Sequence, residues 1–142
     1  MAGEKILVVD DDPDIVAYLT SFLEDNDYEV ESAGNSRVAL SSLKTYRPAA
    51  ILVDVLMPGR SGLDLLVTLR RDPRWSEIPI LVVSGNDQVL DEEFRSYLGS
   101  HAGVRGPDGV LGKPVDPQAL LAVLRRLLDR AGAREQVGDV EA

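Results

Sequence analysis

The sequence contains no cysteine and only one histidine in 142 residues. Without thiols the chain can form neither a disulfide framework nor a thiolate metal site. The absence of cysteine agrees with a reducing cytoplasm, which is the location we expect. No apolar run approaches the length that crosses a bilayer, and the charged residues Glu4 and Lys5 precede only a short one. We therefore expect neither a membrane span nor a signal peptide.

Basic residues are also scarce. Fifteen Lys and Arg stand against 24 Asp and Glu, which gives a formal net charge of -9. Such a chain repels nucleic acid and anionic membranes, so we expect direct binding to neither. The same charge favours bound cations. Hydrophobic residues make up 44% of the chain, which is enough for the core of one domain.

Five short apolar runs alternate with segments of helical periodicity. We expect strands at residues 5–9, 28–32, 49–55, 78–83 and 110–111. We expect helices at residues 13–25, 35–46, 63–69, 89–98 and 117–130. This alternation predicts an α/β fold with a parallel sheet that is covered by helices on both faces. In such sheets ligands bind outside the carboxyl ends of the strands.

Two segments near the end of the chain lack a packed pattern. Residues 99–109 hold four glycines and Pro107, so we interpret them as a loop. Residues 132–142 carry no periodic apolar pattern and are expected to form a disordered tail. A single domain over residues 4–131 is therefore predicted.

Polar side chains stand where the predicted strands end. Asp10 and Asp11 follow the first strand, Asp54 ends the third, Ser84 ends the fourth, and Lys113 follows the fifth. If the strand order is 2-1-3-4-5, strands one and three are neighbours and strand four lies beside strand three. The carboxylates then converge, with a hydroxyl and an ammonium group next to them.

The chemistry of this group points to phosphoryl transfer. Clustered carboxylates repel one another unless a cation joins them. Hard oxygen ligands suit Mg²⁺, and Mn²⁺ would also serve. A carboxylate can act as a nucleophile towards phosphorus, and the charge of the transition state calls for cationic and hydrogen-bonding partners. Each residue alone has a simpler interpretation. A carboxylate after a strand is often only a helix cap, as we expect of Asp12 before Pro13. A serine after a strand is usually a turn residue, and a lysine before proline is usually solvated. The functional interpretation depends on their joint placement.

Four stretches together resemble the receiver domain of bacterial response regulators, similar to the chemotaxis response regulator. They are residues 6–11, 53–62, 82–85 and 113–114, and the Asp-x-x-Met-Pro-x-x-x-Gly segment is the most specific of them. The resemblance implies a doubly wound, flavodoxin-like, five-stranded parallel sheet of order 2-1-3-4-5.

The resemblance also assigns the carboxylates. Asp54 would be the phosphoacceptor. Asp11 and Asp54 would bind Mg²⁺ directly, and Asp10 would act through a water molecule. The backbone carbonyl of Leu56 would be a further metal ligand, so its side chain is free to vary.

The remaining roles concern the phosphoryl group and the switch. Ser84 would bond a phosphoryl oxygen, Gly85 would leave room for the donor, and Lys113 would pair with the phosphoryl group. The bond from Lys113 to Pro114 would be cis. Val110 departs from the family, because an aromatic residue is common at this position. This departure puts the usual aromatic switch in doubt.

The implied function is a phosphorelay step in two-component signalling. A histidine kinase or a phosphotransfer protein would donate the phosphoryl group, and phosphorylation would change the binding of a downstream protein that the sequence does not specify. The protein would be a phosphoacceptor switch and not an enzyme, although it would catalyse its own phosphorylation and dephosphorylation. A homodimer is compatible with this function.

Three other functions compete with this interpretation. A haloacid-dehalogenase-type phosphohydrolase also uses an aspartate and Mg²⁺, but a late acidic pair and a cap domain are missing. A calcium loop on Asp10, Asp12 and Asp14 fails, because Ile15 stands where such a loop needs glycine. A receiver-like binding module that is never phosphorylated remains open.

Overall fold

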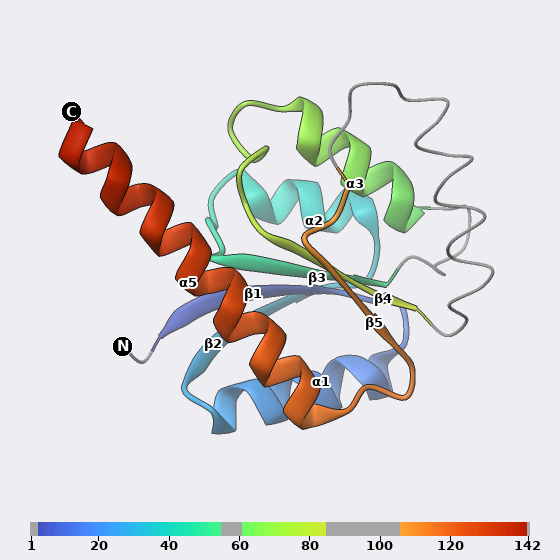
Figure 1. Ribbon diagram of the computed structural model, residues 1–142. Helices are drawn as coiled ribbons and strands as arrows, with labels where there is room; N and C mark the ends of the chain where they lie inside the picture. Colours follow the sequence, from blue (N-terminus) through green and yellow to red (C-terminus); the bar gives the residue numbers. More distant parts are fainter. Residues whose placement is uncertain (1–2, 55–60, 85–105, 142) are drawn as a thin grey trace.

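The computed structural model describes residues 3–54, 61–84 and 106–141 (Figure 1). Five parallel strands form one sheet in the order β2-β1-β3-β4-β5, which confirms the predicted order. The strands are β1 (Glu4–Val9), β2 (Tyr28–Ala33), β3 (Ala50–Asp54), β4 (Ile80–Ser84) and β5 (Gly109–Gly112). The central strands are apolar because both of their faces are covered.

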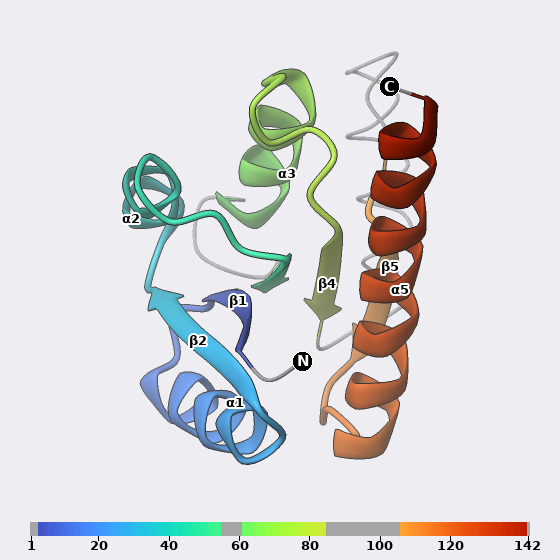
Figure 2. The same cartoon turned by 90° about the vertical axis from the view of Figure 1, so that its left-hand side faces the viewer.

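Helices pack on both faces of this sheet. Helices α1 (Pro13–Asp25) and α5 (Pro117–Glu141) cover one face, and α2 (Ser36–Leu43) and α3 (Ser61–Arg71) cover the other (Figures 1 and 2). Each face has its own apolar cluster. Side chains of β1 alternate between them, since Ile6 and Val8 face α1 and α5 while Leu7 and Val9 face α2 and α3. No helix in the described part of the chain is both long and apolar enough to cross a membrane.

The caps of the first two helices follow from the sequence. The side chain of Asp12 accepts a hydrogen bond from the amide of Asp14 at 2.9 Å, and proline opens α1. The side chain of Asn35 accepts one from the amide of Val38 at 2.9 Å. Both caps satisfy amide groups that a helix leaves without an internal partner. The predicted bounds of α1 are confirmed.

Several predicted ends were wrong. Helix α2 ends at Leu43, and Tyr46 lies beyond it in a turn. Amide groups of this turn donate hydrogen bonds to the carbonyl oxygens of Ser41 and Ser42. Strand β4 begins at Ile80, because Pro79 has no amide hydrogen to donate to a neighbouring strand. Strand β5 begins at Gly109, which was predicted as loop.

The last helix is longer than the sequence predicts. We expected α5 to end near Arg130 and residues 132–142 to lack structure, but the helix continues to Glu141. Residues 131–141 include Ala, Arg, Glu and Gln, which favour a helix, together with Gly132 and Gly138, which do not. Helix α3 begins at Ser61, inside the predicted turn. The rest of that turn, the helix predicted at 89–98 and residues 99–105 of the loop lie outside the described residues.

Candidate functional site

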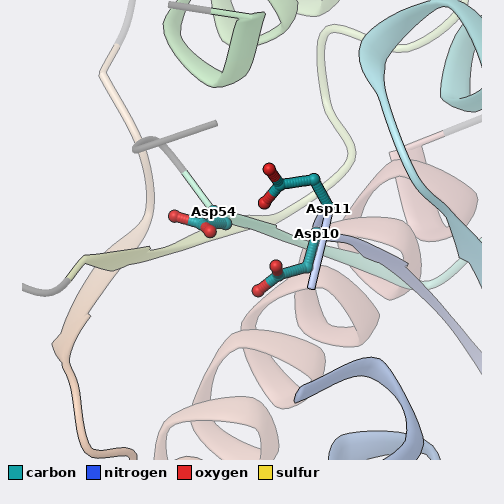
Figure 3. A group of neighbouring side chains, drawn as sticks. All are labelled: Asp10, Asp11 and Asp54. Carbon is teal, nitrogen blue, oxygen red and sulfur yellow. The ribbon is translucent and has the colours of Figure 1, made fainter. Parts of the chain in front are cut away.

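Three carboxylates meet at the carboxyl edge of the sheet. Val9 of β1 pairs with Val53 of β3, so Asp10 and Asp54 follow side by side. They are 3% and 5% exposed, whereas Asp11 is exposed. Carboxylate oxygens of the three residues lie within 4.8 Å of one another (Figure 3). The convergence predicted from the strand order is therefore observed.

Lys113 brings a positive charge to this group. Its Nζ lies 3.1 Å from Oδ2 of Asp54, to which it donates a hydrogen bond, and 3.8 Å from Oδ2 of Asp10. Its side chain is 24% exposed, so it borders the site and remains partly accessible to water. The peptide bond between Lys113 and Pro114 is cis, as the resemblance implies.

Burial and like charge act together on Asp10. Loss of hydration is the main cause that raises the pKa of its carboxyl group, and the negative charges of Asp54 and Asp11 raise it further. The amide of Asp12, which donates to Oδ1 of Asp10 at 2.9 Å, lowers this pKa, as does Lys113. The net direction is upward, so the ionised form of Asp10 is destabilised here.

The donor set fits a hard divalent cation. Two oxygens on opposite sides of one Mg²⁺ ion are about 4 Å apart, because each Mg²⁺–oxygen bond is about 2.1 Å long. Oxygens that lie within 4.8 Å of one another can share one ion when one of the carboxylates binds it through a water molecule. A cation here would also offset the repulsion that raises the pKa of Asp10.

The other predicted site residues are placed only in part. Ser84 ends β4 opposite Gly112 of β5, but its side chain lies outside the description. Leu56 and Gly85 lie outside the described residues. Val110 lies on β5 and is 50% exposed.

Sequence reasoning missed one buried ion pair. Arg70 of α3, 8% exposed as a residue, donates from Nη2 to Oδ2 of Asp108 at 2.7 Å. The two residues are 38 positions apart, so no local spacing could reveal the pair. The signal that the sequence did offer is one acidic residue immediately before a short glycine-bounded strand.

Comparison with known proteins settles the family. The model of the response regulator receiver domain matches residues 6–125. This chain belongs to the receiver domain family. It is a receiver domain of two-component response regulators, and the phosphohydrolase alternative is left without support.

Relatives of this receiver domain are found both as long and as short chains. It is 33% identical to the response regulator Rre1 of Synechocystis sp., over 97% of this chain and 57% of Rre1. It is 32% identical to protein PilH of Pseudomonas aeruginosa, over 87% of this chain and 97% of PilH. The crystal structure of chemotaxis protein CheY4 from Vibrio cholerae shares 31% identity and a TM-score of 0.76, over 89% of this chain and 99% of that one.

The receiver domain therefore spans little more than half of several curated relatives, 57% of Rre1 and 58% of the DNA-binding response regulator MtrA of Mycolicibacterium smegmatis. Almost the whole of PilH is matched instead. The matched part is the receiver, which is where the carboxylates lie.

Proposed function

We propose that this receiver domain accepts a phosphoryl group on Asp54 in a step that requires Mg²⁺. The observation that carries the proposal is the contact of 3.1 Å between Nζ of Lys113 and a buried carboxylate oxygen of Asp54, beside Asp10 and Asp11. A buried carboxylate that is paired with a cation on one side and lies at an acidic cluster on the other suits nucleophilic attack on phosphorus.

The donor would be the phosphohistidine of a histidine kinase or of a phosphotransfer protein. A carboxylate oxygen of Asp54 forms the new bond to phosphorus while the bond from phosphorus to the donor imidazole breaks. The ammonium group of Lys113, next to Asp54, would stabilise the negative charge that develops on the phosphoryl oxygens. Ser84 at the end of β4 is proposed to donate a hydrogen bond to one of these oxygens.

Asp11 and Asp54 are proposed to hold the ion directly, Asp10 through water, and Leu56 through its carbonyl oxygen. When bound, Mg²⁺ supplies charge neutralisation for the carboxylates and the phosphoryl oxygens. Gly85, Val110 and Pro114 are proposed as switch or supporting positions.

We further propose that the protein acts as a switch in the cytoplasm, with no enzymatic activity beyond its own phosphorylation and dephosphorylation. Phosphorylation then changes the binding of a downstream protein.

The test is phosphorylation by acetyl phosphate, followed by intact-mass measurement and mapping of the modified residue. Wild type should gain one phosphoryl group with Mg²⁺ or Mn²⁺ and none with EDTA. Asp54→Asn should gain none. Asp116→Asn is the matched control, because Asp116 caps the start of α5 through a 3.1 Å bond to the amide of Gln118, and asparagine caps equally well. Full labelling of Asp54→Asn would reject the assignment. A wild type that takes no label from any donor would leave the binding-module alternative.

A further inference from the structure

We propose that Arg70 and Asp108 are positioning residues for Lys113, because together they fix the register of β5 against β4. The inference rests on the proposed function, in which Lys113 pairs with the phosphoryl group. The pair lies at the amino edge of the sheet, and the carboxylates lie at the opposite edge, so neither residue touches the reacting atoms. Their effect is carried along a strand of only four residues.

Arg70 joins the segment that enters β4 to the segment that enters β5. Its side chain is 1% exposed. Nη1 donates to the carbonyl oxygens of Ser76 at 3.1 Å and Ile78 at 2.9 Å, just before β4. Nη2 donates to the carbonyl oxygen of Gly106 at 3.1 Å and to Oδ2 of Asp108 at 2.7 Å, just before β5. A planar guanidinium group with five donors is needed to make this set of bonds.

Asp108 then pairs with the first residue of β4. Its amide donates to the carbonyl oxygen of Ile80 at 2.8 Å. The amide of Ile80 donates in turn to Oδ2 of Asp108 at 2.8 Å. The same oxygen thus accepts from both Arg70 and Ile80. The side chain, and not only the backbone, therefore decides which residue stands opposite Ile80.

The apolar pattern of β5 cannot make this decision alone. Its sequence is Gly-Val-Leu-Gly, Val110 is 50% exposed, and Leu111 is only partly buried. Register is weakly specified where a strand is glycine-rich and buries little on either face. One steric feature helps, since a Cβ on Gly109 would lie 3.0 Å from Leu81 Cδ1 and 3.3 Å from Val123 Cγ1. If β5 slipped by one residue, Asp108 or Val110 would take the place of Gly109, and its Cβ would have to displace Leu81 or Val123.

Register matters because Lys113 directly follows β5. The observed register pairs Ser84 with Gly112 and leaves Nζ of Lys113 3.1 Å from Asp54. A slip of one residue moves the strand by about 3.3 Å along its axis and turns each side chain to the other face. Lys113 would then leave Asp54. The carboxylates themselves follow β1 and β3, which pair independently of β5.

Two measurements on one variant test this. In Asp108→Ala, phosphorylation of Asp54 by acetyl phosphate at saturating Mg²⁺ should slow by about 10- to 100-fold, since a misplacement of about 1 Å can cost this much. The dissociation constant for Mg²⁺, measured by calorimetry, should not rise, because moving Lys113 away takes a competing positive charge from beside Asp54. Lys113→Ala should slow the reaction similarly, and adding Asp108→Ala to it should cause no further loss.

The control is a variant that loses stability elsewhere. Leu43→Ala removes a buried side chain of α2, which packs against β1 and β2 and not beside β5, and at a temperature where it is folded its rate should equal that of wild type. Asp108→Asn, whose amide oxygen still accepts from Ile80, should recover part of the rate. A wild-type rate in folded Asp108→Ala, or losses that add fully in the double variant, would overturn the inference.

Two further readouts keep the test decisive. If Asp108→Ala does not fold, Arg70→Lys makes the same comparison, because an ammonium group keeps the charge but not the planar fork. If wild type accepts no phosphoryl group, the proposed function fails, and the register is measured directly. Backbone nuclear Overhauser contacts between Val82 and Val110, paired in wild type, should then be lost in Asp108→Ala, and their persistence would reject the role of Asp108.

Discussion

Asp11 differs from its two neighbours because its side chain is exposed, while Asp10 and Asp54 are buried. It can therefore change its contacts with little effect on the core. Its negative charge nevertheless raises the pKa of Asp10, which shows that the charges repel across the site. Removing this charge relieves repulsion in the metal-free protein and removes one ligand from the metal-bound protein.

We expect Asp11→Ala to melt above wild type in EDTA and to lose most of its stabilisation by Mg²⁺. For wild type, Mg²⁺ at about a hundred times its dissociation constant adds about 2.7 kcal/mol to the free energy of unfolding. Thermal melts with and without Mg²⁺ measure both effects. Asp129→Ala removes an exposed carboxylate from α5 and should respond to Mg²⁺ as wild type does. An unchanged response in Asp11→Ala would remove Asp11 from the ligand set.

The raised pKa of Asp10 makes stability depend on pH in the metal-free protein. Below the ordinary aspartate value of 3.8 the residue is protonated in both states and costs nothing. As pH rises above 3.8, the unfolded state loses this proton first while the folded state keeps it. The contribution of Asp10 therefore falls as pH rises through its folded-state pKa.

Urea unfolding in EDTA measures this dependence. The free energy of unfolding of Asp10→Asn should exceed that of wild type by a margin that grows as pH rises through this window. Asparagine keeps an oxygen for the amide of Asp12, so the 2.9 Å contact is preserved. A margin that stays constant from acid to neutral pH would show that ionisation of Asp10 costs no stability.

Among the described elements, β5 packs closely against its neighbours because Gly109 has no side chain. Gly109 lets Leu81 of β4 and Val123 of α5 close over the strand. We expect Gly109→Ala to lower the free energy of unfolding by about 1–3 kcal/mol, which is the usual cost of forcing an extra methyl group into a packed region. Urea or thermal unfolding measures the loss.

Gly34 provides the matched control for this substitution. A Cβ at Gly34 would meet nothing within 4 Å, and its backbone does not lie in the left-handed region. Gly34→Ala should therefore leave stability close to wild type. Equal losses in the two variants would show that the cost comes from glycine removal in general and not from packing of α5 on β5.

Strand β5 also shows what could not be predicted from the sequence. Strand β5 and Lys113 after it were predicted from a short apolar run that ends at Lys-Pro, and both are found. The residues that hold β5 in place were not predicted. Arg70 and Asp108 are distant in sequence, and arginine in a helix normally lies in solvent, so its burial depends on the tertiary fold.

For the whole molecule, the two covered faces followed from the alternation of apolar runs, the strand order followed from the resemblance to receiver domains, and the meeting of three carboxylates followed from that order. These features are set by buried surface and by the rules of parallel sheets, which leave a strong mark in sequence. The end of α5 did not follow. Beyond Arg130 the sequence carries no periodic apolar pattern, which is the signal from which the helix was predicted, and yet the helix continues to Glu141.

The single tryptophan of the chain gives a consequence for how this molecule can be observed. Trp75 is 7% exposed in the apolar cluster under α2 and α3, and the guanidinium carbon of Arg74 lies 4.2 Å from its ring centroid. It lies between α3 and β4, at the edge of the sheet opposite the carboxylates. Its emission should be blue-shifted in the native state and move to longer wavelength on unfolding, because the indole then enters water. Addition of Mg²⁺ to the folded protein should leave the spectrum unchanged, so a shift on Mg²⁺ addition alone would mean that the site and this distant cluster move together.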